Sequence, residues 1–443
     1  MAEIGHTTAT EQTDVGSYFV ANYPPFSLWT PEAVETEAMP ALAQPAAEVP
    51  LGLYLHIPFC RKRCHFCYFR VYTDKNASEI EDYLDVVGRE WELYATQPAI
   101  AGRPLRFIYF GGGTPSFLSV RQLQSLVDRL SAVTPWTDAE EITFECEPGT
   151  LTESKLSQIR DMGITRLSLG VEHFDDDVLE LNGRAHRSAE IFRAYDFAQS
   201  LKFPQVNIDL IAGMLGDSDE KWHAAVARTI DLSPDSVTIY QMELPYNTTI
   251  SSDLLKGTGR FTESVANWST KRRWVGEAFD ALEGAGYTVG SAYTAVKDPQ
   301  STRFVYRDQL WQGADLAPLG VSSFGHVNGV HIQNLDSWGP YAAAVRRGDI
   351  PLSRAYRPTD EERLIREFVL QLKKGSVRPG YFRDKYGIDI SNRFGPALAS
   401  LRADGYLMAS DAEQVALTRD GLLRVDSLLP RFFLPEHTDL RYT

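Results

Sequence analysis

The chain has 443 residues, which at roughly 150 residues per domain allows two or three domains, or one large barrel with an attachment. Hydrophobic residues make up 43% and charged residues 23%, so a sizeable core and folding over most of the length are expected. The net charge of −15 disfavours a broad nucleic-acid-binding face. The sequence also lacks a bilayer-crossing apolar run and a signal-peptide pattern, so we predict a cytoplasmic protein without nucleic-acid or membrane partners.

Residues 1–50 are expected to form an N-terminal arm and linker, because an aromatic stretch is followed by a segment rich in Ala, Pro and Glu. From Leu51 onward, short apolar runs of β type alternate with stretches of helical periodicity. These runs are LGLYLHI, LRFIYF, EITFEC, TRLSLG, VNIDLIAG and SVTIYQM. The alternation predicts an α/β fold in which residues 51–290 form a full or partial parallel (β/α)6 barrel, with its ligands at the carboxyl ends of the strands.

The regular alternation fades after this segment. Residues 291–358 are expected to form a connecting region that covers the substrate, and residues 359–443 a mainly helical C-terminal domain with a winged-helix-like end. A winged helix is typical of DNA binding, but the net charge of −15 favours a substrate-covering role.

Three of the four cysteines follow the first strand on one loop. Cys60, Cys64 and Cys67 are therefore expected to bring their thiolates together. A structural zinc ion would need a fourth ligand, for which His56 and His65 are candidates. A cubic 4Fe-4S cluster held by three cysteines would instead leave one iron open for a substrate or cofactor. The residues alone leave both alternatives open.

The Cys-x3-Cys-x2-Cys loop, with Phe66 before its last cysteine, resembles the radical S-adenosylmethionine (SAM) superfamily. The preceding Tyr54-Leu-His-Ile-Pro-Phe-Cys60 resembles the oxygen-independent coproporphyrinogen III oxidase-like branch of that superfamily. The resemblance implies a radical SAM barrel, a 4Fe-4S cluster on the three cysteines, and SAM bound at the open iron.

The resemblance also implies which residues contact SAM. Gly111-Gly112-Gly113-Thr114 is similar to the motif that binds the methionyl amino group, Arg184 is expected to pair with a carboxylate, and Asp209 with ribose hydroxyls. The implied cofactor-binding set is Tyr54, Phe66, Gly111, Gly112, Gly113, Thr114, Glu145, Glu172, Arg184, Asp209, Ile211 and Met242.

The branch contains three functions. The oxidase is expected to have a further cysteine where this chain has Phe69. The haem-binding chaperone is expected to have His-Asn-x-x-Tyr-Trp where this chain has Tyr306-Arg307-Asp308-Gln309-Leu310-Trp311. Glu172 departs from the Gln that is usual in both groups, so we predict the third function and keep the oxidase and the chaperone as alternatives.

The third function is that of class C radical SAM methylases and cyclopropane-forming enzymes. They use two SAM molecules, one for the 5′-deoxyadenosyl radical and one as methylene donor, to modify an sp2 carbon of an unsaturated natural-product intermediate. A proton must leave the adduct, and the candidate acid or base groups are Glu172, His173, Glu243, Tyr293 and His326. Expected partners are the small unsaturated substrate, a reducing protein such as flavodoxin or ferredoxin, and a companion methyltransferase.

Overall fold

The computed structural model describes residues 15, 16, 19–261, 265–438 and 440. Part of the expected N-terminal arm, residues 1–14, 17 and 18, lies outside this description. No helix within the described ranges combines the length and the apolarity that crossing a membrane requires.

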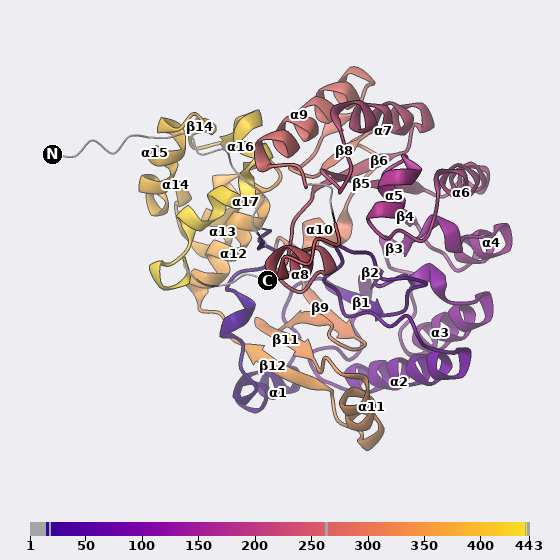
Figure 1. Cartoon of the computed structure of the whole chain (residues 1–443). Helices are drawn as coiled ribbons and strands as arrows, with labels where there is room; N and C mark the ends of the chain where they lie inside the picture. The colour runs from indigo at the N-terminus through magenta and orange to yellow at the C-terminus, as the bar shows by residue number, and fades with distance from the viewer. Residues whose placement is uncertain (1–14, 17–18, 262–264, 439, 441–443) are drawn as a thin grey trace.

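The predicted α/β fold is confirmed, with six parallel strands at the centre of one twelve-stranded sheet (Figure 1). Each strand pairs in parallel with the next along the chain. β1 also pairs with β9, and β6 with β8, so the six strands form a partial rather than a closed barrel. They are β1 (Leu51–Ile57), β2 (Leu105–Gly112), β3 (Glu141–Cys146), β4 (Arg166–Glu172), β5 (Gln205–Ala212) and β6 (Ser236–Gln241).

Helices cover the outer face of this sheet (Figure 1). Several begin with side-chain caps that satisfy free backbone N–H groups, such as the capping boxes Asn76–Glu79 of α2 and Ser119–Gln122 of α3. The helices between residues 51 and 290 are α2 (Ala77–Ala95), α3 (Val120–Val133), α4 (Glu153–Asp161), α5 (Asp176–Leu181), α6 (Ser188–Ser200), α7 (Asp219–Leu232), α8 (Thr249–Lys256) and α9 (Trp268–Gly284). Apolar residues of the strands and of most of these helices form the larger core, whereas Ile250 of α8 belongs to a small cluster with Ile211 and Met242. The inner face of the sheet remains for a site.

The segment 291–358, which is expected from the sequence to be a connecting region, adds strands to both edges of the same sheet. Its β8 pairs with β6, whereas its β9 pairs with β1 and leads into an antiparallel edge. β7 (Thr288–Val289), just before the segment, pairs with β8. The elements of the segment are β8 (Thr294–Val296), α10 (Val305–Leu310), β9 (Asp315–Leu319), β10 (Phe324–Val327), β11 (Val330–Asn334), α11 (Trp338–Arg347) and β12 (Leu352–Tyr356). Helix α10 packs against β2 through the Tyr306 ring, which contacts Phe107 and Tyr109, so it closes the concave side of the sheet.

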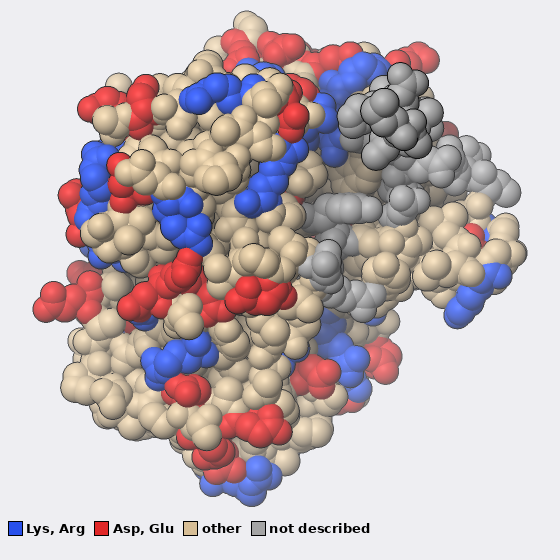
Figure 2. All heavy atoms as spheres, turned by 90° about the vertical axis from the view of Figure 1, so that its left-hand side faces the viewer, with Lys and Arg blue, Asp and Glu red and all other residues tan. Residues whose placement is uncertain are grey.

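The C-terminal part has its own apolar core and a small antiparallel sheet of order β13-β15-β14. This succession of helices and short strands fits the expected winged-helix-like end. The elements are α12 (Asp360–Leu372), β13 (Ser376–Val377), α13 (Pro379–Tyr386), α14 (Ile390–Arg393), α15 (Gly395–Ala403), β14 (Leu407–Ser410), β15 (Val415–Leu417), α16 (Arg419–Leu423) and α17 (Val425–Leu428). On the described part of the face in Figure 2, basic and acidic side chains are interspersed rather than gathered into a basic stripe.

The described part of the arm includes α1 (Met39–Ala43) and packs against both the barrel and the C-terminal domain. The N–H of Gly16 donates to the carbonyl of Leu244 (2.8 Å), just after β6. The buried ammonium of Lys373 donates to the carbonyl of Val20 (2.7 Å) and pairs with Asp426 (2.7 Å). The arm therefore joins the barrel to the C-terminal domain beside the inner face of the sheet.

Candidate functional site

A cavity of about 1280 Å³ occupies the concave side of the sheet. The carboxyl ends of the strands and the loop that holds Cys60, Cys64 and Cys67 line one end of it. Residues of α10, of the arm and of α17 line the rest. The cavity exceeds the roughly 300–1,000 Å³ of most small-molecule sites, so it has room for more than one molecule.

The cysteine loop is positioned by contacts with neighbouring elements. The N–H of Cys60 donates to the carbonyl of Tyr72 (3.1 Å), and the hydroxyl of Thr114 lies 3.3 Å from the Cys60 sulfur. Nη1 of Arg184 lies 3.3 Å from the Cys64 sulfur. Burial raises the pKa of the Cys60 thiol to about 12, and the hydrogen bond from the Thr114 hydroxyl opposes that rise.

The two histidines proposed as zinc ligands are engaged elsewhere. Nδ1 of His65 lies 2.9 Å from the carbonyl of Leu181, and Nε2 of His56 lies 3.3 Å from that of Arg70. Among the described residues, no three or more His, Cys, Asp and Glu side chains are placed to hold a single ion. Zinc needs every sulfur about 2.3 Å from one point, whereas the cysteines of a cluster bind different iron atoms. The loop therefore fits a cluster better than zinc.

The glycine turn after β2 brings its backbone against a buried carboxylate. Gly112 has a φ of 108°, and a Cβ there would lie 2.6 Å from the His56 ring. Its N–H donates to Oε2 of Glu145 (3.2 Å), while the hydroxyl of Tyr109 donates to Oε1 (2.7 Å). Only glycine fits this position, and the turn leaves space for a ligand beside Glu145.

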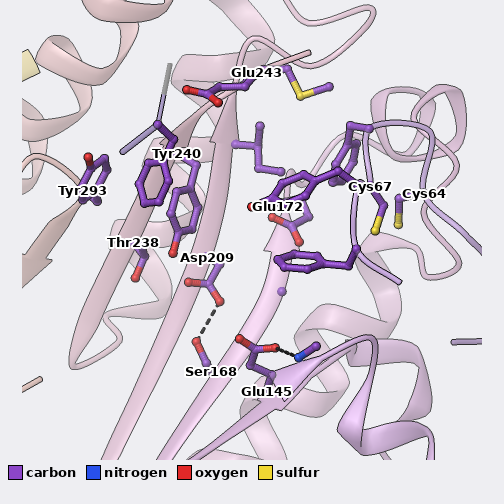
Figure 3. Close-up of a pocket in the computed structure, with 18 of the residues that line it drawn as sticks. Cys64, Cys67, Glu145, Ser168, Glu172, Asp209, Thr238, Tyr240, Glu243 and Tyr293 are labelled. Atoms are coloured by element: carbon purple, nitrogen blue, oxygen red, sulfur yellow. Dashed lines mark hydrogen bonds between the residues drawn. The ribbon is translucent and has the colours of Figure 1, made fainter. Parts of the chain in front are cut away.

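Three carboxylates face the cavity near the cysteines, as Figure 3 shows for Glu145, Glu172 and Asp209. Burial raises the pKa of Glu145 and of Glu172 to about 7, and it also raises the pKa of Asp209. Arg184 lies beside Glu172, with Nη1 3.5 Å from Oε1, and the charge of Arg166 partly opposes the rise in the pKa of Asp209. A cation-bearing ligand such as SAM, which carries a sulfonium and an ammonium, suits such a site.

Glu172 itself has a left-handed backbone conformation with a φ of 64°, at a register shift between β4 and β5. Side chains other than glycine rarely adopt this region, so a local strain is maintained next to the cavity. The buried Nε of Arg184 has no hydrogen-bond partner among the described residues. Both observations indicate that this corner is arranged for a ligand.

Glu147, at the exit of β3, has a positioning role. Burial opposes its ionisation, but hydrogen bonds with His186 (3.1 Å) and Arg61 (2.8 Å) lower the pKa of Glu147 to about 2. Since Arg61 follows Cys60 directly, this contact fixes the start of the cysteine loop. No feature of the sequence indicated this pairing.

Most of the residues predicted for the site line the cavity. Glu243 and Tyr293 are among them, while Ile211 and Met242 form a small apolar cluster against which Phe66 packs. Gly111 lies beneath the surface, where a Cβ would meet Tyr109 and Glu145. The predicted residues that line the cavity are Tyr54, Cys60, Cys64, Phe66, Cys67, Gly112, Gly113, Thr114, Glu145, Glu172, Arg184, Asp209, Ile211, Met242, Glu243 and Tyr293.

The two histidines predicted as acid or base groups do not lie at the cavity. His173 is fully buried, with Nε2 3.3 Å from Oδ1 of Asp217. His326 is paired with His331 between β10 and β11, with their Nδ1 atoms 3.0 Å apart. Strand pairing and core packing bury both rings, and neither is among the residues that line the cavity.

Other cavity residues were missed by sequence reasoning. They come from inward-facing strand positions, such as Tyr109, Ser168 and Thr238, and from α10. The strand alternation was visible in the sequence, but which face is the inner one depends on how the sheet is covered.

Residues 54–228 match the model of the Radical SAM superfamily. The match identifies a radical SAM domain in this part of the chain. It is 26% identical over 372 residues to the heme chaperone HemW of Bacillus subtilis, covering 84% of this chain and 96% of the relative. It is likewise 26% identical over 407 residues to the oxygen-independent coproporphyrinogen III oxidase of Pseudomonas aeruginosa, covering 89% and 88%. The superfamily implies a 4Fe-4S cluster and SAM as cofactors.

Coproporphyrinogen III oxidase (HemN) from Escherichia coli has the same fold, with a TM-score of 0.81 at 24% identity over 95% of this chain and 99% of that one. The branch predicted from the sequence is therefore confirmed. The prediction of a class C methyltransferase or cyclopropane-forming enzyme is wrong, because the relatives matched over most of their length are named as heme chaperones and oxidases. The absence of the oxidase and chaperone motifs was too weak a basis for that choice.

Proposed function

We propose that this protein is a radical SAM oxidoreductase that acts on a tetrapyrrole with carboxylate side chains, of the class to which coproporphyrinogen belongs. The observation that carries the proposal is one continuous cavity, which has the cysteine loop at one end and aromatic residues in its remaining walls. The match to an oxygen-independent coproporphyrinogen III oxidase over 89% of this chain supports it.

The residues at the cysteine end have the chemistry to hold the cofactors. Cys60, Cys64 and Cys67 would hold the cluster, and Arg184 would pair with the carboxylate of SAM. Asp209 would accept hydrogen bonds from ribose hydroxyls, as its contact with the Ser168 hydroxyl (2.8 Å) illustrates. When bound, cluster and SAM supply the radical that removes a hydrogen atom from the substrate. A reducing protein such as flavodoxin or ferredoxin would provide the electron.

The aromatic end of the cavity suits a flat molecule. Tyr240 and Tyr293 are stacked with ring centroids 6.1 Å apart, and in Figure 3 Tyr240 lies between Tyr293 and Glu172. Tyr306 and Trp311 of the α10 region line the same space. Walls of this kind bury a planar ring system and exclude water from the reacting atoms.

The same cavity disfavours the haem-carrier alternative. Its described lining contains no histidine that could bind iron. Tyr306 stands where the chaperone resemblance expects histidine, and burial raises the pKa of its hydroxyl, which keeps it protonated and a poor ligand. Phe69, at the position of the oxidase's further cysteine, is exposed and stacks on Tyr68. The proposal therefore specifies a substrate class rather than coproporphyrinogen III alone.

The test is an anaerobic assay of the reconstituted full chain with SAM, a reductant and coproporphyrinogen III deuterated in its propionate chains. We expect substrate-dependent 5′-deoxyadenosine that contains deuterium, and none of it from Cys64→Ala. Tight, stoichiometric haem binding without substrate-dependent 5′-deoxyadenosine would favour the chaperone function instead.

The number of SAM molecules is a separate part of the proposal. The cavity volume of about 1280 Å³ leaves space beyond one SAM, which we assign to the substrate. Equilibrium dialysis with labelled SAM should give one molecule per chain in the presence of substrate. A value near two would show that a second SAM shares the cavity.

A further inference from the structure

The inner face of β4 carries a buried arginine at the end opposite the cysteines. Arg166 begins the strand and points to the same side as Ser168, Gly170 and Glu172, because alternate residues share a face. Six residues of strand separate Arg166 from Glu172, a distance of roughly 20 Å. The cavity therefore has two polar ends, and only one of them is near the cysteine loop.

Arg166 lacks the hydrogen bonds that a buried guanidinium normally makes. Its side chain is 6% exposed, it has five N–H donors, and it forms no hydrogen bond with any described residue. The nearest carboxylate oxygen, Oε2 of Glu141, is 3.9 Å from Nη1. Since a buried charged donor without an acceptor is costly, this arginine requires an acceptor that the described chain does not provide.

Glu141 has other partners that hold its carboxylate away from Arg166. Its Oε2 accepts a hydrogen bond from the N–H of Val305 (2.9 Å), and its Oε1 accepts one from the N–H of Tyr306 (3.3 Å). The hydroxyl of Thr143 also donates to Oε1 (3.0 Å). These contacts anchor the start of α10 on β3, so the hydrogen bonds of Glu141 go to the helix and not to Arg166.

A second guanidinium lies at the same place. The Cζ atoms of Arg166 and Arg307 lie 3.6 Å and 4.6 Å from the ring centroid of Phe304. Arg307 donates to the hydroxyl of Thr294 (3.2 Å) and to Asp308 (2.9 Å). Asp308 is shared with Lys374 (3.4 Å). Two positively charged guanidinium groups thus contact the same phenyl ring in the cavity wall, and the carboxylates around them only partly neutralise their charge.

We propose that Arg166 and Arg307 form a subsite for a carboxylate of the substrate, with Phe304 holding the two guanidinium groups in place. A planar guanidinium matches a carboxylate through paired hydrogen bonds, and the added negative charge compensates the two cations. The carboxylate of SAM is expected at Arg184, at the far end of β4, so it is not the ligand. The inference rests on the proposed function in that the same cavity receives the substrate.

The walls around the subsite define what the carboxylate is attached to. Tyr306 and Trp311 line the cavity beside Arg307, and the Arg307 guanidinium lies 5.3 Å from the Trp311 ring. A flat unsaturated body that carries its carboxylate on a short chain fits this arrangement. The two arginines therefore select the substrate by its negative charge at one end of the cavity, while the reacting atoms of the substrate lie at the cysteine end.

A binding experiment tests the subsite without turnover. The probes are 1-pyrenebutyrate, a flat aromatic carboxylate, and 1-pyrenebutanol, its neutral counterpart, titrated by fluorescence into the full-length reconstituted protein. We expect the carboxylate to bind at least about tenfold more tightly than the alcohol, as charged hydrogen-bonded groups in buried sites do. Arg166→Gln and Arg307→Gln should each abolish this preference, and Arg166→Lys should keep part of it.

Arg121→Gln is the matched control, because Arg121 is 82% exposed on α3 and should leave the preference unchanged. Affinity for SAM reports whether each variant is folded, and Arg307→Gln tests the site even where the buried Arg166 variant is unstable. Equal binding of the two probes by the wild-type protein, or an undiminished preference in folded Arg307→Gln, would overturn the inference. A preference that depends on both arginines, without turnover of coproporphyrinogen, would retain the subsite and reject the proposed substrate.

Discussion

Nη1 of Arg184 lies 3.5 Å from Oε1 of Glu172, and the same nitrogen lies 3.3 Å from the Cys64 sulfur. Nη2 donates to the carbonyl of Gly170 (2.6 Å). The guanidinium is therefore fixed between the cysteine loop and β4, with its plane set before any ligand arrives. The Arg184 side chain therefore offers a ligand both a positive charge and a fixed plane of N–H donors.

Replacing Arg184 by Lys should weaken SAM binding to the reconstituted protein by at least about tenfold, because an ammonium cannot make the paired contacts of a guanidinium. Isothermal titration calorimetry measures the change. Arg121→Lys is the control, since Arg121 is 82% exposed on α3. Equal affinity of Arg184→Lys and wild type would remove Arg184 from the cofactor site.

SAM binding should strengthen as the pH rises from 6 to 8. Burial raises the pKa of Glu145 and of Glu172 to about 7, so both carboxyls lose their protons in this range and then attract the cationic groups of SAM. Protons compete with SAM below pH 7, and affinity should level off above pH 8. Glu172→Gln should make the dependence shallower, and an affinity independent of pH in the wild type would contradict the assignment.

Gly112→Ala should cost more stability than Gly102→Ala. Both glycines have positive φ, 108° and 72°, but a Cβ at Gly112 would lie 2.6 Å from the His56 ring, whereas a Cβ at Gly102 meets nothing within 4 Å. We expect about 1 kcal/mol for Gly102→Ala and a further 1–3 kcal/mol for Gly112→Ala. Urea unfolding measures the difference, and similar losses would show that the turn tolerates a side chain.

Lys373→Met should destabilise the protein by about 3 kcal/mol, because it leaves Asp426 largely buried without its cation. It also removes the hydrogen bond to the carbonyl of Val20 that holds the arm. Adding Asp426→Asn should recover part of the loss, although the Asp426 contact with the Tyr293 hydroxyl would weaken. A double variant as unstable as the single one would place the cost in the arm contact instead.

The central strands could be predicted closely because each is a short apolar run bounded by turns. The predicted 51–57 and 141–146 coincide with β1 and β3. The strands of residues 315–356 were missed, since they are short, and β9 contains Pro318, which is unusual in a paired strand. The pairing of β9 with β1 is a contact between distant segments that no local pattern reveals.

The same distinction holds for the site. The three cysteines and the glycine turn were found because their spacing within the sequence is itself the signal. His326 was misplaced because its position depends on the antiparallel pairing with His331 and on Trp29, whose ring stacks on His331 from the distant arm. Arg166 was overlooked because a single arginine at a strand start resembles any surface residue until the sheet is assembled.

Helix α10 is only six residues long, yet it supplies one wall of the cavity and is anchored to β3 through Glu141. The cysteine loop and Arg184 lie on other elements, so changes in α10 leave the radical-forming machinery untouched. Substitutions in this short helix would therefore change which substrate is bound, while the binding of the cluster and of SAM is retained. The fold thus keeps the helix that contacts the substrate apart from the loop and strand ends that hold the cofactors.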